Sequence, residues 1–209
     1  MTMVIKRTES RRNRKKAQAR EQIIATAIDL FSRHGLEGVT VEHIADVADL
    51  GKGTIYNYFE TKEDIVVAFM VEKERQIQAK VRRLAASKGA MFAVLTEYIR
   101  FQFQLKRPYH KFVRVFLAQM FSRTEQFGPY MIELQKAIDP NLKALFRSLQ
   151  ARGAMRNDVK ISDLVLIFKT IHLGLSALWA VEGPPFRMTE QIVKQEMKLF
   201  CEGLEAGRR

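Results

Sequence analysis

The chain has 209 residues, a formal net charge of +12, 47% hydrophobic residues and a single cysteine, Cys201. This length and apolar content exclude a largely disordered chain, and one cysteine excludes an internal disulfide. The most apolar stretch, residues 161–181, is interrupted by Asp163, Lys169 and His172, so we expect no membrane span. The N-terminus is polar and basic rather than apolar, so we expect a soluble, cytoplasmic protein.

Positive charge is concentrated at the start of the chain. Residues 1–20 carry eight basic side chains and one acidic one, whereas residues 21–70 carry three basic and nine acidic side chains. A basic run of this kind can be only a solubilising tail. Its position directly before a helix-turn-helix pattern favours another interpretation, in which it attracts the DNA phosphates that the acidic segment repels.

The first predicted helix lies at residues 14–34. Residues 1–13 lack apolar periodicity, so we expect a mobile basic arm there. Ile23 and Ala27 then begin a stripe of apolar residues at helical spacing. Gly35 follows, and glycine can adopt the left-handed conformation that ends a helix.

Residues 40–59 predict two short helices separated by a tight turn. Thr40 is a good N-cap for the first of them. Asp49 lies in the turn, where a left-handed residue is expected and where aspartate is tolerated less well than glycine.

The second of these short helices is the candidate recognition helix. Its face formed by Gly51, Ile55 and Phe59 should be buried. The opposite face carries small, hydroxyl and amide side chains, which suit base edges and phosphates. These residues are Gly53, Thr54 and Asn57, flanked by Tyr56.

The next predicted helix begins near Lys62 and runs to about Ala86. Thr61 is a second N-cap, and the acids Glu63 and Asp64 suit the positive end of the helix dipole. Lys62 conflicts with that dipole. A phosphate bound at this helix N-terminus would resolve the conflict, and a merely exposed lysine is an equal alternative.

The remainder of the chain is predicted to be helical, with no alternating pattern long enough for a strand. The segments are 90–107, 109–123, 129–152, 161–181 and 189–206, separated by Pro108, Gly128, Gly153 and Gly183-Pro184-Pro185. Pro140 should kink or split the third segment. The expected fold is all-α, with about nine helices.

Four motifs in residues 20–70 form one pattern. They are Gly38-Val39-Thr40, Ile44-Ala45, Gly51-Lys52-Gly53-Thr54-Ile55-Tyr56-Asn57-Tyr58-Phe59 and Lys62-Glu63-Asp64. Together they resemble the DNA-binding domain of the tetracycline-repressor family of transcriptional regulators. Beyond residue 70 only length and helical content agree with that family.

The resemblance implies a homodimer whose two helix-turn-helix heads read a near-palindromic DNA operator. It also implies a helical C-terminal domain that binds a small ligand and dimerises through its last two helices. The chain would then divide into a basic arm at 1–13, a helix-turn-helix DNA-binding domain at 14–70 and a ligand-binding and dimerisation domain at 71–209.

The resemblance further implies which side chains bind DNA. Phosphate or sugar contacts are implied for Thr40, Tyr56, Tyr58 and Lys62. Closer contacts with the operator are implied for Lys52, Gly53, Thr54 and Asn57. The basic start of the chain resembles the minor-groove arms of other helix-turn-helix proteins, so four of its residues are further DNA-binding candidates. They are Arg12, Arg14, Lys15 and Lys16.

Two residues depart from the family pattern. Asp49 replaces the usual turn glycine, and Gly51 replaces the usual serine or threonine cap of the recognition helix. We therefore expect a turn of lower stability that depends on DNA for part of its order.

Large, adaptable side chains gather in the second part of the chain and predict a hydrophobic ligand pocket. The candidates are Phe101, Phe103, Phe112, Phe116, Met120 and His172. A filled Phe-rich core, with His172 as a buried histidine with a satisfied partner, is the alternative. Nearby basic residues favour a ligand with an acidic head, although solvated helix faces give the same pattern: Arg100, Lys106, Arg107, Lys111 and Arg114.

The last two helices are the expected dimer interface. The candidates are Leu175, Leu178 and Trp179 with Ile192, Met197 and Phe200, and Gly174 and Ala177 would allow close helix approach.

The sequence therefore predicts a ligand-responsive repressor that binds operator DNA as a homodimer and is released by a small hydrophobic effector, with an anionic group as one option. A DNA-binding regulator with a filled core and no effector is the alternative. The residues argue against an enzyme, because Lys52-Gly53-Thr54 lacks the earlier glycine of a phosphate loop, that position being Val47. No Cys or His pair has metal spacing, so we expect no cofactor and no metal.

Overall fold

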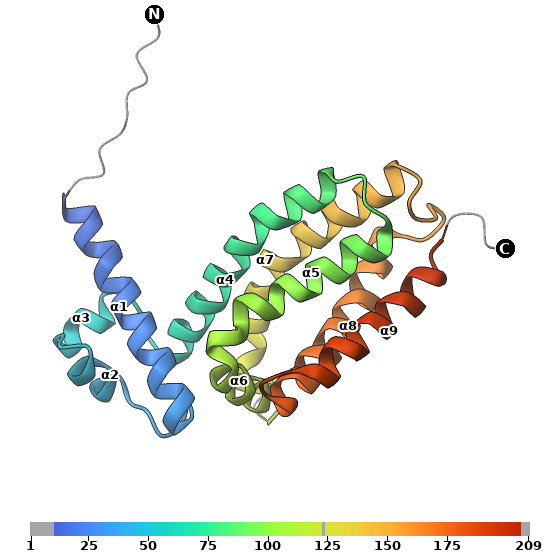
Figure 1. Ribbon diagram of the computed structural model, residues 1–209. Helices are drawn as coiled ribbons and strands as arrows, with labels where there is room; N and C mark the ends of the chain where they lie inside the picture. The colour runs from blue at the N-terminus through green and yellow to red at the C-terminus, as the bar shows by residue number, and fades with distance from the viewer. Residues whose placement is uncertain (1–10, 123, 206–209) are drawn as a thin grey trace, which may run out of the picture. The chain divides into compact units, whose positions relative to one another are not determined.

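The computed structural model describes residues 11–122 and 124–205, which are helical without any strand and confirm the all-α class. They form two compact units, one ending at Ala68 and one beginning at Phe69. The elements in order are α1 Arg11–His34, α2 Val41–Val47, α3 Lys52–Tyr56, α4 Lys62–Ala86, α5 Met91–Lys106, the 3-10 turn η1 Arg107–Tyr109, α6 His110–Ser122, α7 Thr124–Ala151, α8 Ile161–Glu182 and α9 Arg187–Glu202 (Figure 1).

The first unit is built around the apolar stripe of α1. Ile23, Ala27 and Phe31 are fully buried, and Ile44 of α2 and Ile55 of α3 pack into the same core. Because α2 and α3 are short, tertiary packing rather than intrinsic propensity holds them helical.

The described part of α1 starts earlier than predicted. Residues 11–13, assigned to the mobile arm, are already helical, so the arm prediction is wrong for these three positions. Residues 1–10 of the predicted arm lie outside the described residues.

The turn between α2 and α3 has the left-handed residue that the sequence predicts. Asp49 has a φ of 51°, and the backbone N–H of Leu50 donates to the carbonyl of Ala45 at 3.0 Å. Gly35, with a φ of 73°, ends α1 as predicted.

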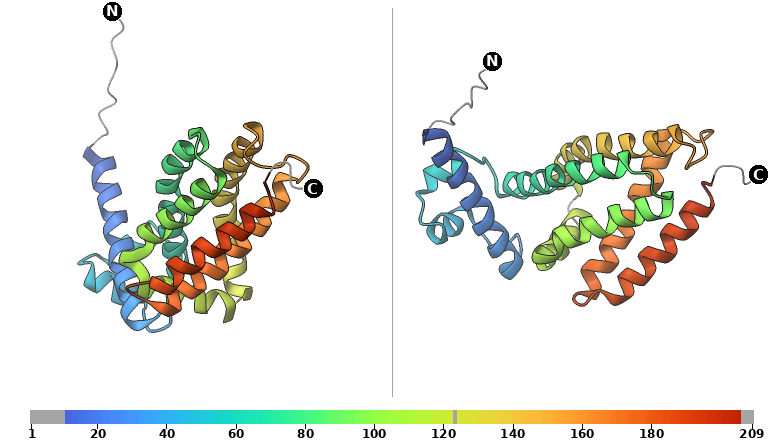
Figure 2. Two further views of the ribbon diagram at one scale, coloured as in Figure 1. Left: turned by 45° about the vertical axis from the view of Figure 1, so that its right-hand side comes forward. Right: turned by 45° about the horizontal axis from the view of Figure 1, so that its top comes forward.

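The second unit is a bundle of packed helices. Figure 2 shows α8 and α9 side by side and joined by a short turn, and α9 also packs against α5. α8 contacts α6 and α7 as well, so one side of it packs against three helices of the bundle. Its side chains Leu164 and Phe168 are fully buried there.

α7 contradicts the predicted break at Gly128 and the predicted option of a split at Pro140. It runs from Thr124 to Ala151 without interruption, through both Gly128 and Pro140. An interior proline costs about 3 kcal/mol. The buried side chains Leu145 and Phe146, which follow Pro140, provide packing that offsets this cost.

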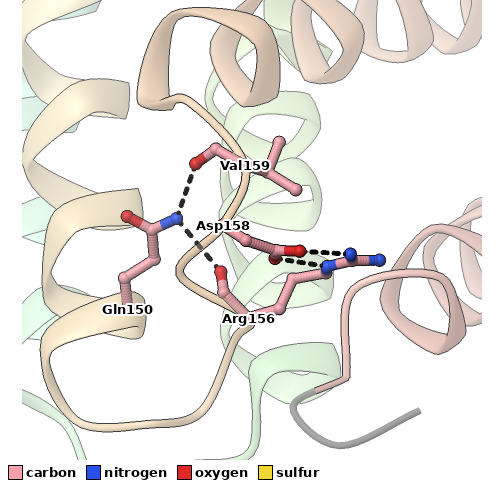
Figure 3. Close-up of polar contacts among 4 residues, drawn as sticks. All are labelled: Gln150, Arg156, Asp158 and Val159. Atoms are coloured by element: carbon pink, nitrogen blue, oxygen red, sulfur yellow. Dashed lines mark hydrogen bonds and ion pairs between the residues drawn. The ribbon is translucent and has the colours of Figure 1, made fainter. Parts of the chain in front are cut away.

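The connection from α7 to α8 is fastened by polar contacts (Figure 3). Nε2 of Gln150 donates to the carbonyl oxygens of Arg156 and Val159, at 3.1 and 2.9 Å. The guanidinium of Arg156 pairs with the carboxylate of Asp158, and its backbone N–H donates to the carbonyl of Leu204. These contacts hold the loop beside the end of α9.

The last helix differs from its prediction at both ends. α9 begins two residues early, at Arg187, and ends at Glu202. Residues 203–205, which the prediction placed in the helix, are not helical, so the predicted end is wrong; residue 206 itself lies outside the described residues.

α8 is, by length and composition alone, apolar enough to cross a membrane. A core helix of a soluble protein has the same character, and the contacts of α8 with α6, α7 and α9 fit that role.

Replacing Asp49 by glycine should raise the free energy of unfolding of the first unit by about 0.5 to 1 kcal/mol, because glycine adopts a positive φ without a Cβ clash. Thermal unfolding followed by circular dichroism measures the change. Asp46→Gly, within α2, is the control and should destabilise by a similar amount. Equal destabilisation by both substitutions would contradict the left-handed assignment.

Candidate functional site

Both ends of α2 have side-chain partners. The hydroxyl oxygen of Thr40 accepts a hydrogen bond from the backbone N–H of His43 at 3.1 Å, which confirms the predicted N-cap. At the other end, Nε2 of Gln22 in α1 donates to the carbonyl of Ala48 at 2.7 Å. These bonds fix α2 against α1 and so position the turn that leads to α3.

α3 presents one buried face and one exposed face. Ile55 and Phe59 are buried, as predicted, but Gly51 is exposed, so its assignment to the buried face is wrong. Gly51 is the N-cap residue and its carbonyl accepts from the backbone N–H of Thr54 at 2.8 Å. The guanidinium of Arg20 lies 5.4 Å from the centre of the Phe59 ring and ties α1 to the end of this segment.

The residues predicted to contact the operator gather on the exposed face. Lys52, Gly53 and Asn57 are exposed, and Tyr56 is 45% exposed. Thr54 and Tyr58 are half-buried. A Cβ at Gly53 would meet no atom of the protein within 4 Å, so only an external partner could require glycine there.

Lys52 is paired within the head. Its ammonium contacts the carboxylate of Glu42 in α2 and lies 5.8 Å from the centre of the Tyr56 ring. The hydrogen bond from Lys52 lowers the pKa of Glu42, and the same bond raises the pKa of Lys52. Both side chains are about half exposed, so this pair is worth little free energy and can be exchanged for a phosphate.

Lys62 has a role that sequence reasoning missed. Its ammonium donates to the carbonyl oxygens of Leu36 at 2.7 Å and Val39 at 3.4 Å, beyond the end of α1. The side chain is half-buried, so the alternative of a merely exposed lysine is wrong. A phosphate contact of Lys62 stays a prediction.

The four basic candidates at the start of the chain lie on the first turns of α1. Arg12, Arg14, Lys15 and Lys16 are all exposed. The helix holds all four charges at fixed spacing, and only Arg12 had been assigned to the mobile arm. Their contact with DNA stays a prediction.

The aromatic candidates of the second unit fall into separate groups. Phe103 stacks on His172, with ring centroids 6.1 Å apart, and on Trp179 at 5.5 Å. Phe112 and Phe116 lie 6.1 Å apart and are buried, as is Met120.

Phe101 lies apart from these groups. It is only half-buried, and the ammonium of Lys80 lies 5.3 Å from its ring centre. Its ring faces a cation of α4, and its place in a ligand pocket stays a prediction.

The described residues of the second unit line hollows at its surface. One, of about 480 Å³, lies where α4 ends and α5 begins and is lined by Leu84, Phe92 and Arg100. Another, of about 230 Å³, is lined by Phe103, Arg107 and Trp179. Of the predicted pocket residues only Phe103 borders either hollow.

The dimer candidates divide by burial. Leu175, Trp179 and Met197 are at most 2% exposed within the subunit. Their assignment to the interface therefore needs correction, because a covered side chain has little surface to offer a partner. Leu178 is 38% exposed, and Ile192 and Phe200 are half-buried.

Sequence reasoning missed exposed apolar residues on the same two helices. They are Leu166, Ile167, Leu173 and Val181 of α8 and Met188 and Leu199 of α9. At 100° per residue the members on α8 fall within about 140° of the helix circumference, and Leu178 lies in the same sector, so they share one broad face. This solvent-facing group of apolar residues was the feature of the sequence that could have indicated an interface.

The fold and the exposed face of α3 define a helix-turn-helix DNA-binding protein with a separate helical unit. Residues 23–69 match the family model described as "Bacterial regulatory proteins, tetR family". This segment is therefore a DNA-binding domain of that family, which confirms the resemblance seen in its motifs.

Two relatives show how far the similarity extends beyond the matched domain. The chain is 28% identical over 120 residues to the HTH-type transcriptional regulator RutR of Escherichia coli K12, covering 57% of this chain and only 56% of RutR. It is 26% identical over 174 residues to the HTH-type transcriptional repressor AcnR of Corynebacterium diphtheriae, covering 82% and 86%. These names describe regulators rather than enzymes.

A solved structure supports the whole fold. The transcriptional regulator FadR of Bacillus subtilis, in complex with stearoyl-CoA, matches 88% of this chain and 98% of its own with a TM-score of 0.74. At 20% identity this likeness shows the shared fold alone.

Proposed function

We propose that this protein is a cytoplasmic transcriptional repressor that binds a near-palindromic DNA operator as a homodimer and is released by a small hydrophobic effector with an anionic group. The observation that carries the DNA-binding part is the exposed face of α3. Lys52, Gly53 and Asn57 are exposed there on a helix whose other side is buried through Ile55. Such a face suits base edges in the major groove.

The acidic first unit needs help to bind phosphate. Its residues 21–70 carry nine acidic and three basic side chains, which repel a polyanion. The exposed basic residues at the start of α1 provide a positive potential that attracts the phosphates. Lys52 can leave its ion pair with Glu42 and bind a phosphate instead.

A second copy of the chain is the partner that fits the apolar stripe of α8 and α9. Leu166 is 66%, Val181 79% and Leu199 59% exposed. Exposed apolar surface of this extent on adjacent helices is typical of a subunit interface. A symmetric pair would place two α3 helices on half-sites about 34 to 36 Å apart.

The effector part rests on the interior of the second unit and on its shared fold. FadR of the same fold was solved with stearoyl-CoA, an amphiphile with an anionic part. Full release of a mostly bound population requires about 5 kcal/mol of differential ligand affinity between the two states.

A regulator without an effector is the second candidate, and the packing of Phe112, Phe116 and Met120 favours it. Buried polar atoms that lack partners in the same unit favour an effector instead. Ligand-induced changes in melting temperature distinguish the two.

Asn57→Ala should weaken binding to a selected operator by about 1 to 3 kcal/mol and relax the choice of base, because an exposed amide that reads a base edge is removed. Fluorescence anisotropy with matched and mismatched duplexes measures both effects. Asn157→Ala, an exposed asparagine of the second unit, is the control. Equal affinity of Asn57→Ala and wild type would remove Asn57 from the base-reading set.

Replacing Arg12, Arg14, Lys15 and Lys16 by glutamine should weaken binding to all duplexes and flatten the salt dependence. The slope of log K against log salt should fall by about 0.9 for each phosphate that the variant no longer neutralises. A control variant carries glutamine at four other exposed basic positions: Arg82, Arg83, Lys88 and Lys194. An unchanged slope in the first variant would mean that these four side chains do not contact DNA.

Leu178→Arg should produce monomers with poor operator affinity, because it places a charge within the apolar stripe of α8. Sedimentation velocity measures the oligomeric state. Phe121→Arg, at a 61% exposed position of α6, is the matched control and should stay dimeric. A stable dimer of Leu178→Arg would contradict the interface.

A further inference from the structure

A group of polar side chains is buried inside the second unit. Glu74 of α4 is 3% exposed, and its carboxylate accepts a hydrogen bond from Nδ2 of Asn141 in α7 at 2.8 Å. Tyr98 and Gln102 of α5 are 1% and 3% exposed. Lys106, which is half-buried, follows at the same four-residue spacing, so these three side chains lie along one face of α5.

Donors in this group lack partners among the described residues. Nε2 of His172 is buried without a hydrogen bond. The hydroxyl of Tyr98 has the side chain of Gln102 beside it but no hydrogen bond of good geometry. Lys106 makes no hydrogen bond or ion pair with any residue that the structure describes. A buried polar group without a partner costs about 1 to 3 kcal/mol, so such groups point to a ligand more than to a stable core.

The net charge of this group of side chains is positive. Burial raises the pKa of the Glu74 carboxyl to about 7, so this carboxyl is about half ionised near pH 7. Burial lowers the pKa of Lys106 to about 8, while the charge of Glu74 opposes that shift, so Lys106 is mostly charged. Burial and the charge of Lys106 hold the pKa of His172 well below its usual value, so its imidazole is neutral.

We propose that Lys106, with Tyr98 and His172, binds the carboxylate of an amphiphilic acid, which replaces Glu74 as the counter-charge of Lys106. This inference rests on the proposed effector response and gives the effector a chemical class. One desolvated cation with two neutral donors matches a single carboxylate better than the several phosphate charges of a CoA ester.

An aromatic ring borders the site. The ring of Phe103 stacks on the imidazole of His172. Phe103 also lines the surface hollow of about 230 Å³, so it lies between the solvent and His172. Displacement of this ring would open a path for the hydrocarbon part of the ligand.

Binding of the acid changes the charge of α4. The groups around Glu74 are Tyr98 and Lys106 of α5 and the neutral Asn141 of α7, and His172 of α8 faces Lys106. A second carboxylate beside Lys106 disfavours the ionised form of Glu74, so Glu74 takes up a proton. Because α4 begins at Lys62 in the first unit, this change occurs on the helix that enters the DNA-binding head.

Isothermal titration calorimetry of the full chain tests the proposal with octanoate, decanoate, dodecanoate and phenylbutyrate, with the matching alcohols and with decanoyl-CoA. Titrations near pH 7 in two buffers of different ionisation enthalpy give the protons taken up per ligand. We expect at least one acid to bind more tightly than its alcohol and its CoA ester, with uptake of about half a proton.

Three variants assign the residues. Lys106→Met should weaken acid binding by about tenfold to a hundredfold and leave alcohol binding unchanged. Lys111→Met, at an exposed position of α6, is the matched control. Glu74→Gln should keep acid binding and lower the proton uptake. Circular dichroism verifies that each variant folds, and Tyr98→Phe, which removes one donor without changing the volume, should weaken the acid alone.

Binding of none of the acids, equal weakening of acid and alcohol by Lys106→Met, or unchanged proton uptake in Glu74→Gln would each overturn the proposal. Operator release is measured separately by anisotropy. Acid binding with proton uptake but without operator release would leave this site intact and contradict the proposed effector response.

Discussion

The ammonium of Lys62 joins two parts of the DNA-binding unit that lie far apart in the sequence. It donates to the carbonyl oxygens of Leu36 and Val39, which follow α1, from the first residue of α4. The orientation of α2 and α3 depends on this closure, because Thr40 caps α2 directly after Val39. A half-buried lysine bound to backbone carbonyls therefore connects the operator-binding face to the helix that continues into the second unit.

We propose that DNA affinity and sequence specificity come from different helices. The exposed face of α3 has the side chains to distinguish bases, yet the surrounding segment is acidic. Affinity for phosphate must come from the first turns of α1, where a helix holds the basic residues in place. In the proposed complex, Lys52 would exchange its partner Glu42 for a DNA phosphate.

Local features were predictable from the sequence, and features that depend on tertiary packing were not. The cap at Thr40 and the left-handed Asp49 follow from neighbouring residues, and the structure has both. The uninterrupted α7 and the burial of Trp179 depend on what packs against them, and the sequence predictions were wrong there. The partners of Lys62 and the group around Glu74 join residues from separate helices, which helical spacing within one segment cannot reveal.

Selection of bound duplexes from a random DNA pool by the full chain tests the central claim most directly. The account predicts enrichment of two inverted half-sites whose centres lie about one helical turn, or a multiple of it, apart, because two symmetric heads present α3 to the major groove. Recovery of unrelated sequences, or of one isolated half-site, would contradict a dimeric repressor that reads its operator through α3.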